Sequence, residues 1–144
     1  MSCWKNGRVR MTEVVLDASA LVAVLLQEPG AEIVERALDA GPCGISAVNL
    51  AEVVTKLVDR GGDEKTIRAG LDSIQLDIRP FEEAMAIDSG MLRTLTRPFG
   101  LSLGDRACIA LARSLDLPVM IADRKWDRLD LGIAVLLARP TPES

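Results

Sequence analysis

The sequence predicts one α/β domain in which helices cover both faces of a central, mostly parallel sheet. Its 144 residues, 49% of them hydrophobic and 26% charged, are enough for a single domain with a sizeable core. Along the chain, short apolar runs alternate with segments of helical length and periodicity. Parallel strands are joined through helices and buried on both faces, so this alternation is typical of a parallel sheet.

Two short strands and four helices are expected in the first half of the chain. The strands are predicted at residues 14–16 and 44–46, and the helices at residues 18–28, 31–38, 47–60 and 64–74. Pro29 and Gly30 stop the first helix, Gly61 and Gly62 stop the third, and Asp63 is placed to cap the fourth. The first helix is apolar nearly all round, which indicates burial in the fold or under a partner.

Three strands and two longer helices are expected in the second half. The strands are predicted at residues 76–79, 118–122 and 133–137, and the helices at residues 81–95 and 103–115. Leu76 and Ile78 alternate with charged residues, and Pro80 follows them, which is typical of an edge strand. The predicted domain spans residues 13–139.

The two ends of the chain, residues 1–12 and 140–144, are expected to be tails outside the domain. The first ten residues have no periodicity and carry three basic side chains, and a second methionine, Met11, precedes the first predicted strand. An upstream start, an expression remnant and a basic arm all explain this segment. The C-terminal tail is polar and contains two prolines.

Missing residue types exclude several kinds of chemistry. The chain has no histidine, so it has no Ser-His-Asp triad, no histidine general base and no His-ligated zinc. Its three cysteines are widely spaced and form no C-x-x-C pair, which argues against a disulfide framework or a zinc ribbon. We expect a cytoplasmic protein without membrane contact, because we recognise neither a signal peptide nor a membrane-spanning run.

Four carboxylates are candidates for a shared site. Asp17 and Asp123 each follow an apolar strand, Asp105 opens a predicted helix, and Glu52 lies inside another helix. Ligands of open parallel sheets bind beyond the carboxyl ends of the strands, where Asp17 and Asp123 are expected to meet. Carboxylates in one crevice repel each other unless a cation lies between them, and Mg²⁺ or Mn²⁺ is the natural occupant. The chain has 21 acidic and 17 basic residues, a formal net charge of -4, and without these four acids the two counts would be equal. The negative charge can therefore be concentrated in one crevice, and it does not exclude a nucleic-acid partner.

Each acid also has a purely structural explanation. Asp17 is placed to cap the following helix, and Asp105 has the spacing of a capping box. Glu52 precedes Lys56 by four residues, which is a favourable spacing for an exposed ion pair on a helix. Asp123 can belong to an ordinary turn. Position alone therefore leaves both a metal site and a set of structural carboxylates open.

Four short motifs occur in order along the chain. They are VLDASAL at residues 15–21, SAVNLAEV at residues 46–53, LSLGDRAC at residues 101–108 and ADRKW at residues 122–126. Together they resemble the PIN-domain ribonucleases of the VapC toxin family, over nearly the whole predicted domain. The resemblance implies a PIN-like fold and a Mg²⁺- or Mn²⁺-dependent endoribonuclease, the toxin of a type II VapBC toxin–antitoxin pair.

The resemblance also assigns the site. The family's four acids fall on Asp17, Glu52, Asp105 and Asp123. Asp17 and Asp105 are expected to bind the ion most directly, with the other two completing the site. In a chain without histidine, hydrolysis of the RNA phosphodiester by a metal-activated water agrees with the composition. The family usually has threonine two positions before the fourth acid, where this chain has Ile121, so that hydroxyl group is missing.

Substrate and partner contacts are expected around these acids. Ser19, Asn49, Arg106 and Arg124 are candidates for RNA contacts, since arginine suits phosphate and the chain has few aromatic residues for base stacking. By resemblance, the helices between residues 18 and 38 receive a VapB-like antitoxin, and the toxin forms a homodimer. The family's usual targets are transfer RNAs and ribosomal RNA loops, and the resemblance does not choose between them.

Two other classes of function remain open on the sequence. One is a non-catalytic α/β module whose acidic crevice binds a metal ion or a basic partner segment. The other is a metal-dependent phosphatase. Trp126, beside the fourth acid, is expected in the core rather than against a base.

Overall fold

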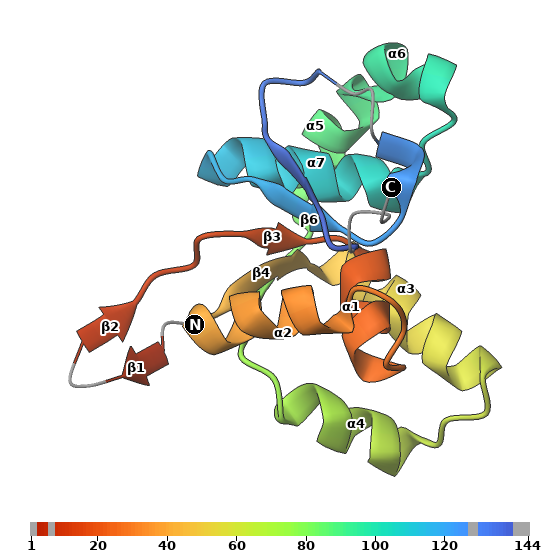
Figure 1. The fold of residues 1–144 in the computed structure, drawn as a ribbon. Coiled ribbons are helices and arrows are strands. Elements are labelled where there is room, and N and C mark those ends of the chain that lie inside the picture. Colours follow the sequence, from red (N-terminus) through yellow and green to blue (C-terminus); the bar gives the residue numbers. More distant parts are fainter. Residues whose placement is uncertain (1–2, 6–7, 127–129, 140–144) are drawn as a thin grey trace, which may run out of the picture.

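The computed structural model describes residues 3–5, 8–126 and 130–139 and contains a sheet of five strands (Figure 1). From one edge to the other, the strands are β5 (Leu76–Arg79), β4 (Cys43–Ser46), β3 (Val15–Leu16), β6 (Val119–Ile121) and β7 (Val135–Leu137). All neighbouring strands in this sheet pair in parallel. The predicted parallel sheet is confirmed, and so is the edge position of the strand at residues 76–79.

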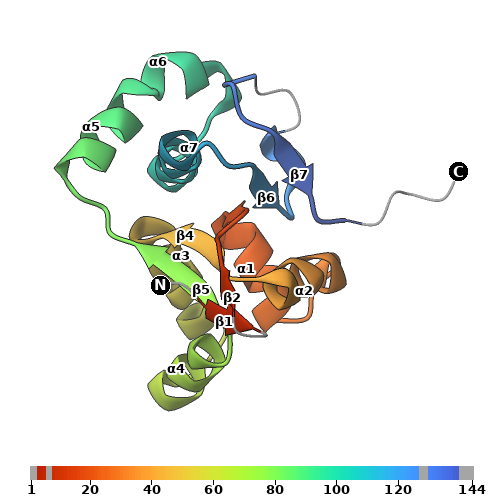
Figure 2. The ribbon, with the colours of Figure 1, turned by 90° about the vertical axis from the view of Figure 1, so that its left-hand side faces the viewer.

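Helices connect these strands and cover the sheet on both sides, as predicted. They are α1 (Ala18–Leu25), α2 (Ala31–Ala40), α3 (Ala47–Asp59), α4 (Glu64–Asp72), α5 (Glu83–Met91), α6 (Arg93–Thr96) and α7 (Leu103–Leu115). In Figure 2, α5, α6 and α7 lie on one side of the sheet, and α1, α2 and α4 on the other. Helix α3 contacts both α1 and α7. In the part of the chain that the structure describes, no helix has the length and apolar character needed to cross a membrane.

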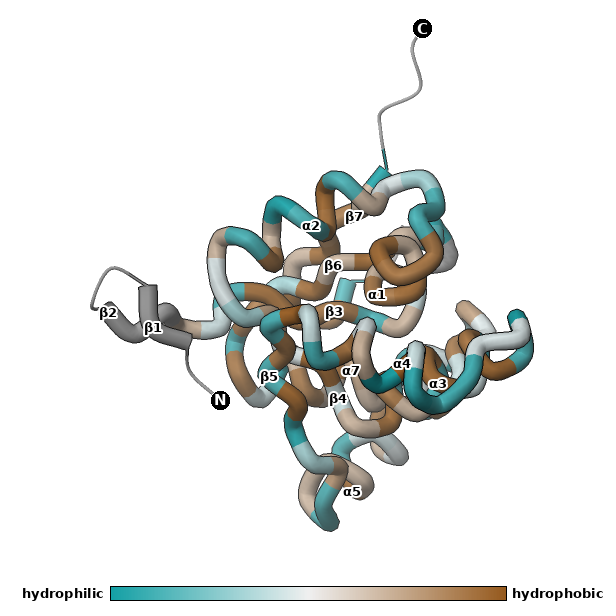
Figure 3. The backbone as a smooth tube through the Cα atoms, turned by 90° about the horizontal axis from the view of Figure 1, so that it is seen from below, coloured by the Kyte–Doolittle hydropathy of each residue, from teal (hydrophilic) through white to brown (hydrophobic). Residues whose placement is uncertain are grey.

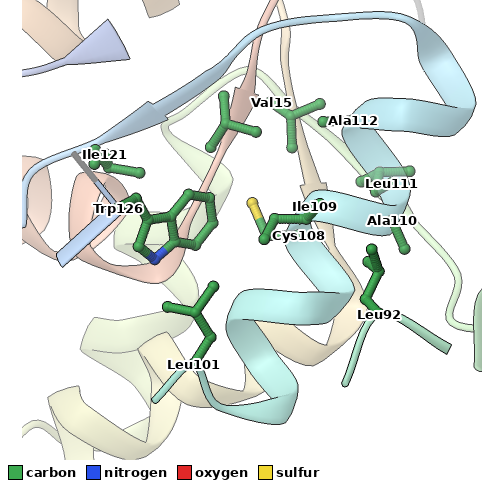
Figure 4. Close-up of a cluster of buried hydrophobic side chains, with 11 residues drawn as sticks. Val15, Leu92, Leu101, Cys108, Ile109, Ala110, Leu111, Ala112, Ile121 and Trp126 are labelled. Atoms are coloured by element: carbon green, nitrogen blue, oxygen red, sulfur yellow. The ribbon is translucent and has the colours of Figure 1, made fainter. Parts of the chain in front are cut away.

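Alternate residues of the central strands enter two different parts of the core. Val15 and Ile121 belong to the cluster around α7, which also contains Trp126 (Figure 4). Leu16 and Met120 belong to the cluster beneath α1 and α2. The sheet is therefore buried on both faces, which explains why its central strands are continuously apolar. In the view of Figure 3, the hydrophobic strands β3 and β6 lie among helices that carry hydrophilic stretches.

Two predicted helices end or divide earlier than expected. The helix predicted over residues 18–28 ends at Leu25, and Gln27 then takes a left-handed backbone conformation with φ 52°. The helix predicted over residues 81–95 divides at Leu92 into α5 and α6. Leu92 is buried in the cluster around α7, so the junction between the two helices is anchored in the core.

An antiparallel hairpin precedes the domain. Its strands are β1 (Cys3–Lys5) and β2 (Arg8–Arg10), and it projects away from the rest of the molecule (Figure 1). The hairpin was not expected from the sequence, although the Asn6-Gly7 dipeptide is a known signal for two-residue hairpin turns. Closer to the domain, Thr12 Oγ1 donates a hydrogen bond to Asp77 Oδ2 in β5 (2.9 Å).

Asp77 explains why the edge strand departs from simple alternation. Its side chain is buried, whereas the neighbouring Ile78 is 49% exposed. Burial alone raises the pKa of Asp77, but hydrogen bonds from Arg79 (Nε to Oδ1, 3.0 Å) and Thr12 outweigh burial and hold that pKa below its usual value. A buried acid with charged and hydroxyl partners therefore takes the place of an apolar residue.

Candidate active site

Asp17 lies at the carboxyl end of β3 and begins α1. Its side chain is buried, and its Oδ1 accepts hydrogen bonds from the backbone N–H of Ala20 (2.9 Å) and from Ser19 Oγ (2.7 Å). Ser19 Oγ also accepts from the backbone N–H of Ala122, directly after β6 (2.9 Å). Asp17 is thus an N-cap, and Ser19 ties it to the neighbouring strand. These bonds fix the carboxylate at the sheet edge where ligands of such folds bind.

Asp105 is held at the start of α7 by a capping box. Its Oδ2 accepts a hydrogen bond from the backbone N–H of Ser102 (3.0 Å), and Ser102 Oγ accepts one from the backbone N–H of Asp105 (3.2 Å). Only 7% of the residue is exposed. The structural role considered for Asp105 is therefore present. It holds the carboxylate at the N-terminal end of a helix, where the helix dipole favours negative charge.

Glu52 reaches the same region from α3. Its Oε1 accepts a hydrogen bond from Asn49 Nδ2 (3.0 Å), and the same amide donates to the backbone oxygen of Gly104 in α7 (2.9 Å). Asn49 is 1% exposed, whereas Glu52 itself remains open to solvent. Among the ion pairs of the described residues, none joins Glu52 to Lys56. The exposed helical pair considered for Glu52 is therefore wrong.

The charges of these three carboxylates act on one buried thiol. Cys108 is fully buried on α7, and its Sγ donates a weak hydrogen bond to the backbone oxygen of Leu16 at the end of β3 (3.7 Å). Burial raises the pKa of the Cys108 thiol well above its usual value, and the negative charges of Asp17, Asp105 and Glu52 raise it further. Three of the four predicted acids thus lie near enough to this thiol for their charges to affect its pKa.

Asp123 lines a pocket beside these acids. The pocket has a volume of about 230 Å³, and Ser19, Lys56 and Arg139 line it as well. Asp123 follows β6 and is exposed. Arg139 Nε donates a hydrogen bond to the backbone oxygen of Ala122 (2.7 Å). Ala122 is the residue before Asp123, so this bond ties the guanidinium to the backbone beside that acid. Ser19 therefore belongs both to the surroundings of Asp17 and to the pocket of Asp123.

The other predicted residues lie at the margin of this region or in the core. Arg106 Nη1 donates to the backbone oxygen of Ser89 (3.0 Å) and joins α7 to α5. Arg124 is exposed and begins a 3₁₀ turn, η2 (Arg124–Trp126). Ile121 and Trp126 are buried, and Trp126 packs against the core as predicted (Figure 4). Contacts of Ser19, Asn49, Arg106 and Arg124 with a substrate stay predictions.

Three residues beside the acids were not anticipated as part of the site. Cys108 follows Asp105 by three positions and Lys56 follows Glu52 by four, so helical spacing was a usable signal for both. Arg139 had no local signal, because only the pairing of β6 with β7 brings it to the pocket.

The donors in this region suit a hard divalent cation. Carboxylates are supplied by the end of β3, by α3 and by the start of α7, and the raised pKa of Cys108 keeps its thiol protonated at neutral pH. Asn49 Oδ1 is buried with no hydrogen-bond partner among the described residues. Within those residues, however, no three acidic or cysteine side chains form a ready-made metal-binding group. The role of Asp17 and Asp105 as metal ligands therefore stays a prediction.

The fold and the site together define a class of α/β protein. In this chain, a parallel sheet is combined with carboxylates at the end of β3, on α3 and at the start of α7. The family profile of the PIN domain matches residues 14–131, which is most of the chain. The chain belongs to the PIN domain family. No curated protein matches its sequence significantly.

Several solved structures share this fold. VapBC from Salmonella typhimurium bound to DNA is 19% identical, with 89% of this chain and 99% of that chain covered and a TM-score of 0.70. VapBC2 from Rickettsia felis, bound to a DNA fragment from its promoter, is 19% identical, with 85% of this chain and 96% of that chain covered and a TM-score of 0.66. VapBC-1 from nontypeable Haemophilus influenzae is 18% identical, with 87% of this chain and 97% of that chain covered and a TM-score of 0.63.

Proposed function

We propose that this PIN domain is a VapC-type toxin that hydrolyses RNA with the help of a divalent metal ion. The observation that supports it most is the placement of three acids in a PIN domain: Asp17 is fixed at the end of β3, Asp105 at the start of α7, and Glu52 lies against Gly104, next to Asp105. The absence of histidine favours metal-assisted over imidazole chemistry. The similarity to VapBC structures favours a toxin among the possible PIN-domain proteins.

Each acid has a distinct part in this proposal. Asp17 and Asp105, both fixed by backbone hydrogen bonds, would hold Mg²⁺ or Mn²⁺, with Asp123 beside them. When bound, the ion supplies activation of a water molecule and stabilisation of the leaving oxygen of the phosphodiester. Glu52 would complete the metal site: its Oε1 is held by Asn49, which leaves Oε2 to face the ion and to orient the attacking water.

The pocket of Asp123 offers two basic side chains to the phosphates of a substrate, and Glu28 lines it as well as Asp123. Lys56 from α3 and Arg139 from the segment after β7 line it together. The Nε of Arg139 is already used by Ala122, so the terminal amino groups of this arginine remain for a phosphate. We therefore assign the RNA backbone next to the scissile bond to this pocket.

Metal removal tests the proposal directly. The purified chain is expected to cleave RNA in Mg²⁺ or Mn²⁺ and to stop in excess EDTA, and cleavage should return when Mn²⁺ is restored. The measurement is gel analysis of structured transfer and ribosomal RNA, with a panel of phosphomonoesters assayed in parallel. Cleavage that survives EDTA contradicts the proposal. Hydrolysis of phosphomonoesters alone indicates a phosphatase, and metal binding without any turnover indicates a binding module.

A VapB-like antitoxin is the proposed partner. The solved relatives include VapBC toxin–antitoxin assemblies. In this chain, α1 is almost entirely apolar and its last residues, Val24 and Leu25, are only partly buried. Ile33 on α2 is partly buried as well. An apolar segment of the antitoxin is therefore proposed to lie across α1 and α2, next to the pocket of Asp123.

A homodimer is proposed through the opposite side of the molecule. Ile87, Met91 and Leu95 follow one another at a spacing of four residues on α5 and α6, and they are 56%, 74% and 56% exposed. Met91 and Leu95 also line a cavity of about 500 Å³ together with Arg113 of α7. An exposed apolar stripe of this kind is typical of a protein interface, and a two-fold dimer buries the same stripe of both copies.

Met91→Glu is expected to convert this dimer to a monomer. The substitution places a charge in the centre of the apolar stripe, and loss of a central contact weakens a dimer by about 30-fold or more. Sedimentation velocity over a range of protein concentrations measures the change. Val58→Glu on α3, where the native side chain is 55% exposed, is the matched control and should remain dimeric. A dimeric Met91→Glu protein would show that the interface lies elsewhere.

A further inference from the structure

Glu52 lies directly over a glycine of the neighbouring helix. Gly104 is the second residue of α7, and a Cβ added there would overlap Oε1, Cδ and Oε2 of Glu52. These carboxylate atoms are the three nearest heavy atoms to that position. The backbone of Gly104 does not have the positive φ that would itself require glycine. The absence of a side chain at Gly104 therefore provides space for one carboxylate.

Asn49 holds the same carboxylate from the side of α3. Its Nδ2 donates to Glu52 Oε1 (3.0 Å) and to the backbone oxygen of Gly104 (2.9 Å), so one amide links the carboxylate to the α7 backbone. The side chain is 1% exposed, and its Oδ1 has no partner among the described residues. A buried amide that leaves its acceptor unpaired is costly, and such groups are found where a site needs their geometry.

We propose that Gly104 and Asn49 form a seat that positions the Glu52 carboxylate toward the divalent cation. Gly104 leaves the space, and Asn49 sets the direction of Oε1. Both are positioning residues, because they act through Glu52. The sequence predicts Asn49 as an RNA contact, whereas this proposal gives it the role of supporting the Glu52 carboxylate. This inference rests on the proposed function, in which Glu52 belongs to the metal site.

A methyl group at position 104 would displace the carboxylate more easily than the helix. The overlapping atoms are the end of a flexible side chain and not the backbone of α3. Alanine also favours a helix more than glycine does. Gly104→Ala is therefore expected to disturb the site without destabilising the fold, which is the opposite of what a purely structural glycine predicts.

The first test compares metal affinity with stability. Gly104→Ala is expected to weaken Mn²⁺ binding by about tenfold, the usual size for loss of a support around a metal ligand. Binding is measured in the absence of RNA by electron paramagnetic resonance of free Mn²⁺, and stability by the thermal unfolding temperature in EDTA, which should not fall. Gly70→Ala in α4 is the matched control, since its Cβ would meet only Leu25 at an ordinary 3.7 Å. An unchanged Mn²⁺ affinity in Gly104→Ala overturns the inference.

The second test asks whether position 104 acts through Glu52. Glu52→Asp is one methylene shorter, so its carboxylate is expected to withdraw from position 104. In that background, Gly104→Ala should weaken Mn²⁺ binding by less than about twofold, compared with the tenfold loss in the wild-type background. A tenfold loss in both backgrounds overturns the inference, because position 104 then acts by another route.

Asn49→Ala provides the other half of the test. It should weaken Mn²⁺ binding by about tenfold and should add little in the Glu52→Asp background. If removal of this buried amide unfolds the protein, the two Gly104 comparisons still decide the outcome. Failure of the proposed function has a different signature. A wild-type protein that neither binds Mn²⁺ nor cleaves RNA rejects the metal site, and with it the role of Glu52.

Discussion

Asp17→Asn is expected to lower metal-dependent RNA cleavage by at least about 100-fold while leaving the fold intact. The change removes the charge from one of the two acids predicted to bind the ion most directly. Asparagine can still accept the hydrogen bonds that the backbone N–H of Ala20 and Ser19 Oγ donate to Asp17 Oδ1. Since asparagine and aspartate are similar N-caps, the free energy of unfolding in EDTA should change by less than about 1 kcal/mol.

Initial rates of RNA cleavage and urea denaturation together check this expectation. Asp63→Asn is the matched control, because Asp63 caps α4 by accepting from the backbone N–H of Thr66 (2.8 Å) and belongs to no part of the site. The control should cleave RNA at the wild-type rate. Wild-type cleavage by Asp17→Asn would contradict the site assignment. A large loss of stability in Asp17→Asn alone would show that the charge of Asp17 serves the fold.

Local periodicity was sufficient to predict the fold class and many of the element boundaries. Helix α7 occupies residues 103–115 as predicted, because Ser102 caps its start and Asp116 ends it in a left-handed conformation with φ 54°. The order of the strands was not predicted, since periodicity describes one segment at a time and strand order depends on pairing between distant segments. The same limit applies to Asp77, whose burial depends on a bond from Thr12.

The acids of the candidate site were recognisable because their positions follow from elements that the sequence predicts. Asp17 and Asp105 turned out to be helix caps as well, so the structural and functional explanations apply to the same side chains. The hydrogen bond from Asn49 to Glu52 was not predicted, because Lys56 offered an equally good partner by spacing. The overlap of Gly104 with Glu52 was beyond prediction, because it depends on how α3 packs against α7.

Gly30→Ala is expected to destabilise the protein by about 3 kcal/mol. Gly30 precedes α2 with φ 100°, a left-handed conformation that costs any other residue energy. A Cβ there would also overlap the backbone oxygen of Ala138. That backbone cannot yield easily, because the N–H of Ala138 donates to the backbone oxygen of Ile121 at the end of β6 (2.6 Å). The backbone strain of an alanine at this φ and the overlap of its Cβ with Ala138 therefore both lower the free energy of unfolding.

Gly61→Ala separates these two causes. Gly61 follows α3 with φ 90°, and a Cβ there would meet no heavy atom of the described residues within 4 Å. Its substitution should therefore cost only the conformational strain, about 1–2 kcal/mol. Urea denaturation of both variants measures the difference, which is the contribution of the contact between Gly30 and Ala138. Equal losses in the two variants would mean that the turn before α2 can move away from Ala138 without cost.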